Sequence, residues 1–252
     1  MEINDVWSAD HKGWFRTRDK QRCEPLTIMD SKSRYILGVQ AGSSTADGHN
    51  WPVFERLFRD NGLPRRIRSD NGPPFASAGI TGLTPLSVRF IKLGIGLERI
   101  TPGKPQQNGR HERFHGTMLP LQRNPAKDQV SQQQAFDAFC HEYNHERPHE
   151  ALGQTMPGEH YAKSPRLMPD TLPEPEYPEE ATVRRVRQNG EIRWNGTYVY
   201  VSQTIADEKV AVTQTDEGDW VMQFYAHTLG TIDQRTNRLT RPPKKRQQGD
   251  KQ

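Results

Sequence analysis

Five prolines between residues 165 and 178 constrain this sequence more than any other feature. They are Pro165, Pro169, Pro173, Pro175 and Pro178, and acidic residues lie between them. Because proline fixes φ and lacks a backbone N–H, this stretch cannot form a helix interior or a central strand. We interpret residues 162–182 as an acidic, semi-extended linker. The 252 residues are long enough for two small domains, and the linker places the first at residues 1–161.

Strand and helix patterns alternate before the linker. Strands are expected at residues 6–15, 66–69 and 97–100, and a hairpin at 25–39. Helices are expected at residues 51–61, 86–93 and 108–121, with Asn108 as a cap, and from residue 131 onward. Ser131 and Gln134 form a capping-box pattern for this last helix. This order predicts an α/β layer fold.

The pattern after the linker is that of short strands. Two strand-like segments, 191–194 and 198–201, flank Asn195-Gly196, which is a strong hairpin signal. Apolar residues alternate again at 209–214 and 220–224. We therefore expect a small β-barrel domain at residues 183–235. Residues 236–252 are basic and poor in apolar residues, which predicts a disordered tail that either binds nucleic acid or is only solvated.

Composition excludes several classes of protein. Only 32% of the residues are hydrophobic, and no run approaches the roughly 18 apolar residues of a membrane helix. The N-terminus has no basic region followed by an apolar stretch, so we expect no secretory signal. Cys23 and Cys140 cannot form a disulfide framework, which indicates a reduced, cytoplasmic protein with inert cysteines. The net charge of +4 permits a nucleic-acid partner without establishing one.

Three carboxylates stand out by their positions. Asp10 lies in the first expected strand, Asp70 closes a short strand, and Glu112 lies in an expected helix. Taken singly, they have ordinary explanations as an exposed strand residue, a turn former and a solvated ion-pair partner. Taken together, they offer the oxygen ligands that Mg²⁺ prefers, and two such ions can clamp a reacting phosphodiester.

Four sequence blocks resemble the catalytic core of insertion-sequence transposases in the retroviral-integrase superfamily. The blocks run over residues 4–10, 68–75, 101–113 and 143–152. The resemblance implies an RNase H-like mixed sheet flanked by helices, and the C-terminal domain is similar to the SH3-like barrel that follows many integrase cores. It further implies that Asp10, Asp70 and Glu112 are the catalytic triad and the ligands of two Mg²⁺ (or Mn²⁺) ions.

The same resemblance implies a DDE transposase, a polynucleotidyl transferase that cleaves and joins DNA strands during transposition. Its partners would be transposon ends, target DNA and further copies of this chain, in a bacterial cytoplasm and on the nucleoid when bound. Five polar residues flank Glu112 and are the expected phosphate contacts: Lys104, Gln107, Asn108, Arg110 and Arg113. The chain starts almost at the first catalytic strand, without the helix-turn-helix region usual in such transposases. We therefore expect weak, largely sequence-independent DNA binding.

A zinc metallohydrolase is a competing interpretation. The pattern His-Glu-x-x-His occurs at residues 111–115, 141–145 and 145–149, and on a helix it can place two histidines on a zinc ion. Each copy has a defect, because Pro148 interrupts the third and charged residues accompany the other two. Histidines of this kind are more often solvated or hydrogen-bonded on polar faces.

An inactive or truncated nucleic-acid-binding remnant of a transposase is the other alternative. The barrel and the tail can hold nucleic acid through phosphates alone. We interpret Trp194 and Trp220 as core or hairpin pairs in preference to base-stacking platforms. The intact Asp10, Asp70 and Glu112 favour the enzyme, because a decayed binder would not need to keep all three.

Overall fold

A computed structural model describes residues 1–100 and 109–241, with the side chain of residue 47 left out. It has two compact units. The first comprises Met1–Ser77 and Thr84–Pro173, and the second comprises Ala78–Leu83 and the chain from Glu174 onward. Each unit is described by itself.

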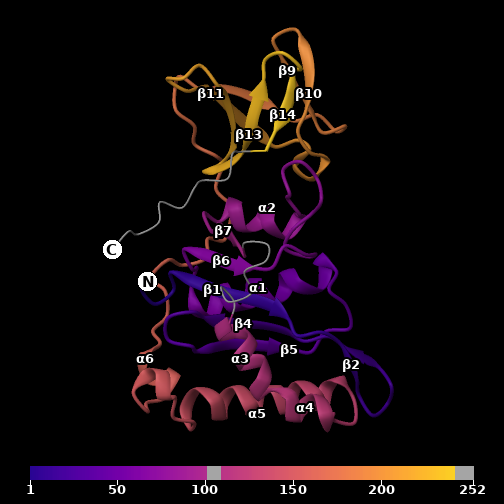
Figure 1. Cartoon of the computed structure of the whole chain (residues 1–252), viewed down its shortest axis with the longest axis vertical. Helices are drawn as coiled ribbons and strands as arrows, with labels where there is room; N and C mark the ends of the chain where they lie inside the picture. Colours follow the sequence, from indigo (N-terminus) through magenta and orange to yellow (C-terminus); the bar gives the residue numbers. More distant parts are fainter. Residues whose placement is uncertain (101–108, 242–252) are drawn as a thin grey trace. The chain divides into compact units, whose positions relative to one another are not determined.

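The first unit is built on a five-stranded mixed sheet in the order β5-β4-β1-β6-β7 (Figure 1). The strands are β1 (Val6–His11), β4 (Leu26–Asp30), β5 (Ile36–Gln40), β6 (Arg66–Ser69) and β7 (Gly96–Arg99). β4 pairs antiparallel with β1 and β5, whereas β6 is parallel to β1 and β7. The alternation predicted from the sequence is therefore present as a mixed sheet.

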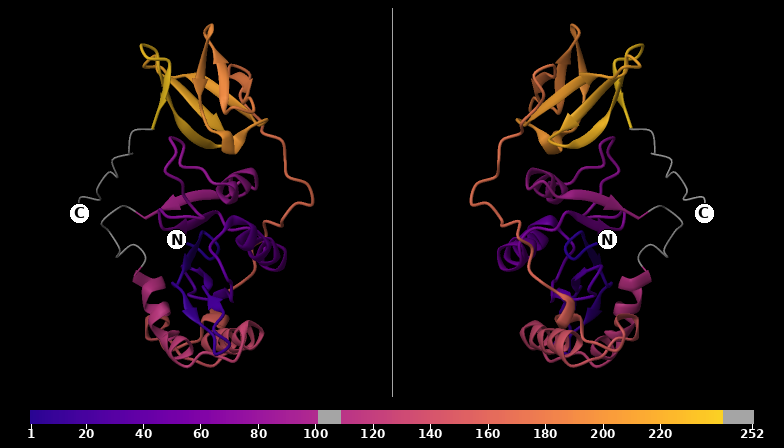
Figure 2. Two further views of the ribbon diagram at one scale, coloured as in Figure 1. Left: turned by 90° about the vertical axis from the view of Figure 1, so that its right-hand side faces the viewer. Right: turned by 90° about the vertical axis from the view of Figure 1, so that its left-hand side faces the viewer.

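Helices cover both faces of this sheet (Figure 2). They are α1 (Asp47–Asn61), α2 (Pro85–Lys92), α3 (Gly109–Thr117), α4 (Leu119–Arg123), α5 (Gln129–His145) and the short α6 (Pro157–His160). Trp7 and Ile28 belong to one core cluster with side chains of α1 and α2. Met29 and Ile36 belong to a second cluster with side chains of α3 and α5.

Strand periodicity decides which side chains face α3. Successive side chains of a strand point to opposite faces, so Trp7 and Ala9 enter the cluster of α1 and α2. Ser8 and Asp10 then point to the face that α3 covers. In β4, Thr27 lies on this same face, and it pairs in register with Asp10.

Three local expectations are corrected. The first predicted strand ends at His11 and is followed by Gly13 at φ 88° and a two-stranded ribbon, β2 (Phe15–Arg16) and β3 (Arg22–Cys23). The long helix predicted at 108–121 is divided into α3 and α4, because Pro120 has no N–H and its ring would clash with the carbonyl of Gly116. The predicted cap Asn108 lies outside the described residues.

The cap of α5 is the third correction. The helix begins at Gln129, and the carboxylate of Asp128 accepts the backbone N–H of Ser131 at 2.8 Å. The capping box predicted for Ser131 and Gln134 was therefore wrong. By contrast, α2 opens with a reciprocal capping box between Thr84 and Ser87, two residues that were not predicted as a cap.

After a short 3-10 turn (Glu150–Leu152) and α6, the described chain forms no helix or strand until β8. Its first part, from Ser164 to Met168, packs on the core. The N–H of Ser164 donates to Asn61, the N–H of Leu63 donates to Arg166, and the Arg166 guanidinium donates to the carbonyls of Pro64, Leu93 and Gly94. The boundary at residue 161 stays a prediction, and the compact unit itself runs to Pro173.

The second unit is all-β, as expected. Its strands are β8 (Thr182–Arg185), β9 (Glu191–Trp194), β10 (Thr197–Tyr200), β11 (Lys209–Gln214), β12 (Trp220–Phe224), β13 (His227–Asp233) and β14 (Arg238–Thr240), with a 3-10 turn at Gln203–Ile205. They form an antiparallel sheet, β14-β13-β12-β11-β8, and the predicted β9–β10 hairpin. The Trp194 and Trp220 rings pack edge to face at 5.0 Å, as a core pair.

The predicted tail begins too early in the sequence. β14 pairs with β13, and its Leu239 is buried in the sheet core. One apolar residue at the right register is enough to add a strand to an existing sheet edge, so residues 238–240 are not a tail. Residues 242–252, which hold most of the expected basic tail, lie outside the described residues.

Candidate active site

Neighbouring parallel strands bring two of the predicted carboxylates to one end of the sheet. In β1 and β6, Ser8 pairs with Arg68. Two residues further along each strand, Asp10 and Asp70 come level with one another, and neighbouring strands lie about 4.8 Å apart. Asp70 is exposed, and its carboxylate accepts the N–H of Gly72 at 3.1 Å in a local turn.

Asp10 is much less exposed than its partners. Its side chain is 22% exposed, whereas Asp70 and Glu112 are classed as exposed residues. Burial, together with the negative charges of Asp70 and Glu112, raises the pKa of Asp10 to about 7 against the lowering effects of the His11 backbone and Lys12. Asp10 therefore lies within electrostatic reach of both Asp70 and Glu112. Such a group resists holding three negative charges, which is a condition that a bound cation relieves.

A threonine hydroxyl lies at the centre of the buried side of this site. The hydroxyl of Thr27 donates to the backbone carbonyl of Asp10 at 2.9 Å. Its oxygen also contacts Nε2 of His111 at 2.6 Å and Nε2 of His115 at 2.8 Å. Nδ1 of His111 lies 2.9 Å from the hydroxyl of Ser8. Both histidines come from α3 and are buried.

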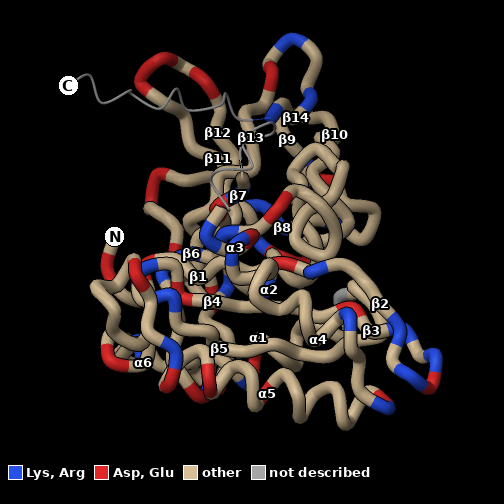
Figure 3. Tube along the Cα trace, turned by 60° about the horizontal axis from the view of Figure 1, so that its bottom comes forward, with Lys and Arg blue, Asp and Glu red and all other residues tan. Residues whose placement is uncertain are grey.

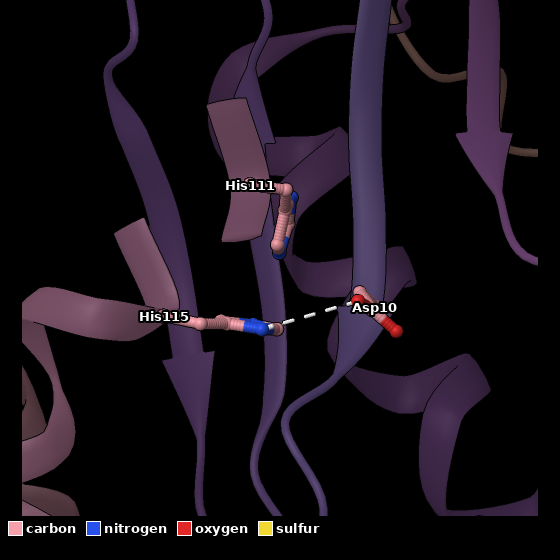
Figure 4. Close-up of side chains that lie close together, drawn as sticks. All are labelled: Asp10, His111 and His115. Carbon is pink, nitrogen blue, oxygen red and sulfur yellow. Dashed lines mark ion pairs between the residues drawn. The ribbon is translucent and has the colours of Figure 1, made fainter. Parts of the chain in front are cut away.

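Both imidazoles are neutral in this environment. Burial lowers the pKa of His111 well below its usual value, and the neighbouring His115 lowers it further. Burial, together with the charge of Lys12, lowers the pKa of His115 to about 3. Asp10, His111 and His115 offer ligand atoms that lie within 4.8 Å of one another (Figure 4). In that view the His115 imidazole extends toward Asp10, and His111 lies close to it.

The geometry argues against the zinc-hydrolase interpretation. A metalloprotease helix presents two histidines to one zinc ion, but here both Nε2 atoms of the first pattern face the Thr27 hydroxyl. In the second and third patterns, His141 and His145 are exposed on α5. The expectation of histidines that are solvated or hydrogen-bonded on polar faces holds for these two residues, which are exposed. His111 and His115 are hydrogen-bonded, as the expectation allowed, but they are buried.

The predicted phosphate contacts are only partly described. Lys104, Gln107 and Asn108 lie outside the described residues. Arg110 and Arg113 line a pocket of about 420 Å³, together with Arg34 and Arg147. Burial and the nearby Arg110 and Arg113 lower the pKa of the Arg34 guanidinium, so these positive groups face one another.

This arginine pocket has few counter-charges. Glu150 is the acidic side chain in its wall, as far as the described residues go. Elsewhere basic and acidic residues are interspersed along the chain (Figure 3). The pocket therefore concentrates a positive charge that the modest overall charge does not reveal.

Sequence reasoning did not identify Ser8, Thr27, Arg34 or Arg147 as site residues. A signal existed for the first two, since a small hydroxyl residue in a strand rich in apolar residues needs a hydrogen-bond partner when it is buried. Which partner it takes depends on helix α3, which lies 84 to 103 residues further along the chain.

The family model described as Integrase core domain matches residues 93–157. This stretch of the chain is therefore similar to an integrase core domain. The matched segment includes Glu112, α5 and the block at residues 143–152, and it ends before the packed segment from Ser164.

Two proteins similar to this chain come from insertion elements. The IS407 uncharacterized 31.7 kDa protein of Burkholderia multivorans is 26% identical over 170 residues, which cover 64% of this chain and 56% of the relative. The IS476 uncharacterized 39.2 kDa protein of Xanthomonas euvesicatoria is 27% identical over 162 residues, which cover 62% of this chain and 44% of the relative. The chain thus spans about half the length of these curated relatives.

A solved structure supports the fold. A chain of the simian T-cell lymphotropic virus intasome, determined by cryo-EM in complex with PP2A regulatory subunit B56 gamma, aligns with 90% of this chain and 78% of its own length. The TM-score is 0.52 and the sequence identity is 16%. The likeness concerns the fold, and the predicted integrase-like α/β core followed by β structure is confirmed.

No helix among the described residues is long and apolar enough to cross a membrane.

Proposed function

We propose that this chain is a DDE transposase that cuts and joins DNA strands during transposition, with Asp10, Asp70 and Glu112 as its catalytic residues. The observation that carries the proposal is the electrostatic coupling of Asp10 to Asp70 and Glu112 at one end of a mixed sheet. The integrase core match and the insertion-element relatives support the same reaction class.

The donor set fits divalent cations of the Mg²⁺ or Mn²⁺ type. The three carboxylates come from β1, the end of β6 and α3, and one of them is partly buried whereas the other two are exposed. When bound, two such ions supply charge neutralisation and Lewis acidity for in-line displacement at phosphorus. The protein's own part is to hold its carboxylates there and to keep Asp10 fixed through the Thr27 hydrogen bond to its backbone carbonyl.

The arginine pocket provides the proposed grip on DNA. Arg110, Arg113, Arg34 and Arg147 line the same 420 Å³ space, and guanidinium groups bind phosphate oxygens well in bidentate geometry. Arg110 also donates to the carbonyl of Ser31 at 2.6 Å, which lies in the turn after β4, beyond the end of β1 opposite to Asp10. A DNA strand bound in the arginine pocket would be held several phosphates away from the reacting phosphate.

Strand joining at two DNA ends requires at least two active sites, so we propose that several copies of the chain assemble on DNA. The assembled copies would act on transposon ends and target DNA in a bacterial cytoplasm. A binder without turnover is the alternative, and the catalytic assay separates the two.

The test is a strand-transfer assay on pre-cleaved DNA ends with Mg²⁺ or Mn²⁺. In metal sites, loss of a residue that only hydrogen-bonds to a ligand costs about 10- to 100-fold. Asp10→Asn, Asp70→Asn and Glu112→Gln change the proposed ligands themselves, so each should lower activity by more than about 100-fold. Glu142→Gln is the matched control, because Glu142 holds the same place in the exposed His-Glu-x-x-His pattern of α5. Full activity in any folded triad variant would remove that residue from the proposal, and inactivity of the unchanged protein with either metal would favour the binder.

A further inference from the structure

We propose that Nδ1 of His115 is a metal ligand beside Asp10, and that this nitrogen makes the position prefer a transition-metal ion such as Co²⁺ or Zn²⁺ over Mg²⁺. The inference rests on the proposed function only in sharing Asp10. It concerns a residue outside the three carboxylates, and it follows from the hydrogen bonds around Thr27.

The Thr27 hydroxyl determines where the imidazole protons lie. A hydroxyl has one proton to donate, and Thr27 donates it to the carbonyl of Asp10, which can only accept. The two remaining contacts, to Nε2 of His111 and Nε2 of His115, are hydrogen bonds only if both imidazoles donate. Both neutral rings are therefore protonated at Nε2, and both Nδ1 atoms carry a lone pair.

The two lone pairs have different surroundings. The single proton of the Ser8 hydroxyl has two acceptors within reach, Nδ1 of His111 at 2.9 Å and the Met29 carbonyl at 3.4 Å. The shorter contact is the stronger one, and it satisfies Nδ1 of His111 as an acceptor. Nδ1 of His115 lies 3.9 Å from Oδ2 of Asp10, which is too long for a hydrogen bond (Figure 4). His111 is thus a positioning residue, whereas His115 directs an unshared pair at a carboxylate.

That arrangement matches a metal position more closely than a hydrogen bond. Two ligands at about 2.0–2.2 Å from one ion lie about 3.0–3.4 Å apart, so a movement of roughly half an ångström closes the gap. Metal-binding histidines usually donate their other ring N–H to a fixed acceptor, and Thr27 takes this part here. Imidazole nitrogen favours transition-metal ions, whereas Mg²⁺ takes oxygen ligands.

A conservative variant separates the ligand from the hydrogen bond. His115→Gln places an amide nitrogen near the position of Nε2, so the contact with Thr27 is kept and the Nδ1 lone pair is lost. Titration of the whole chain with Co²⁺ alone, without DNA, should show an affinity loss of about tenfold or more in this variant. The affinity for Mg²⁺ should change less than about twofold. His141→Gln, on exposed α5, is the matched control and should change neither value.

Two spectroscopic measurements keep the inference testable if the variant folds poorly. In the Co²⁺-loaded unchanged chain, proton NMR should show a contact-shifted, slowly exchanging ring N–H from Nε2 of His115. In the metal-free chain, long-range proton–nitrogen NMR should identify both His111 and His115 as Nε2–H tautomers. An Nδ1–H tautomer at His115, or equal Co²⁺ affinity before and after His115→Gln, would overturn the inference.

These outcomes are independent of catalysis. If strand transfer proceeds with Mg²⁺ and no contact-shifted N–H is found, the proposed function stands and the histidine ligand is wrong. If Co²⁺ binds through His115 and no metal supports strand transfer, the ligand stands and the proposed function is wrong.

Discussion

Helices α3 and α5 carry the same His-Glu-x-x-His pattern, but its two histidines are buried on α3 and exposed on α5. On α3, His111 and His115 are buried against the sheet and bonded to Ser8 and Thr27. On α5, His141 and His145 are exposed, and the residues between them, Tyr143 and Asn144, are buried instead.

The difference lies in what each helix meets. α3 covers strand positions where hydroxyl groups offer partners to two imidazoles. α5 packs on the edge strand β5, where Asn144 donates to the carbonyl of Ile36 at 2.9 Å and accepts its N–H at 2.8 Å. The facing surface, not the motif, decides which side of a helix becomes functional.

The largest stability effect should come from Thr27→Val, on the α3 side. The change removes the partner of two buried imidazole N–H groups, and each unsatisfied buried donor costs about 1–3 kcal/mol. We expect a loss of about 2–5 kcal/mol in the free energy of unfolding, measured by urea denaturation. Thr27→Ser keeps the hydroxyl and should retain most of the stability. Equal losses in both variants would mean that the methyl group, which only Thr27→Ser removes, contributes as much to stability as the hydroxyl.

Asn144→Ala tests the α5 side. It removes both hydrogen bonds to Ile36, which tie the edge strand β5 to α5. With a net value of about 1 kcal/mol for each bond, the expected loss is about 2 kcal/mol in urea denaturation. Asn189→Ala, at an exposed turn, is the control and should change little. A larger loss than for Thr27→Val would reverse the ranking of the two helices.

The arginine pocket joins the two helices, because Arg113 comes from α3 and Arg147 follows the end of α5. Arg113→Gln and Arg147→Gln should each reduce the slope of log K against log salt for duplex DNA by about 0.9, the value for one phosphate contact. Arg56→Gln, on exposed positions of α1, is the control. If the salt slope is unchanged in Arg147→Gln, Arg147 makes no phosphate contact, and the pocket binds DNA only through α3.

The smallest effect should come from His141→Gln. His141 lies 3.6 Å from Glu146, and both side chains are largely exposed, so their interaction is weak. The free energy of unfolding should change by less than about 0.5 kcal/mol. A loss close to that of Thr27→Val would show that burial does not separate the two histidine patterns.

The residue patterns were sufficient for the order of the main strands and helices of the α/β core, since alternation and helical spacing are local signals. The mixed sheet was expected only from the family resemblance. It was not sufficient for the Thr27 cluster. That cluster depends on the register that pairs Asp10 with Thr27 and on the packing of α3 across both strands. The cap at Asp128 and the strand at Leu239 were missed because a stronger local pattern, the Ser131 box or the run of basic residues, drew the prediction elsewhere.

The segment from Ser164 to Met168 has a practical consequence for anyone who wishes to produce the core by itself. A fragment that ends at Tyr161 would lose the carbonyl of Arg166 that receives the N–H of Leu63, and it would uncover the buried Leu63. Gly62 is shaped for this contact, since its φ is 74° and a β-carbon there would collide with the Ser164 carbonyl. An expression boundary at Pro173 preserves the contact of the Ser164–Met168 segment with Gly62 and Leu63. A fragment that ends there should stay in solution at higher concentration than one that ends at Tyr161.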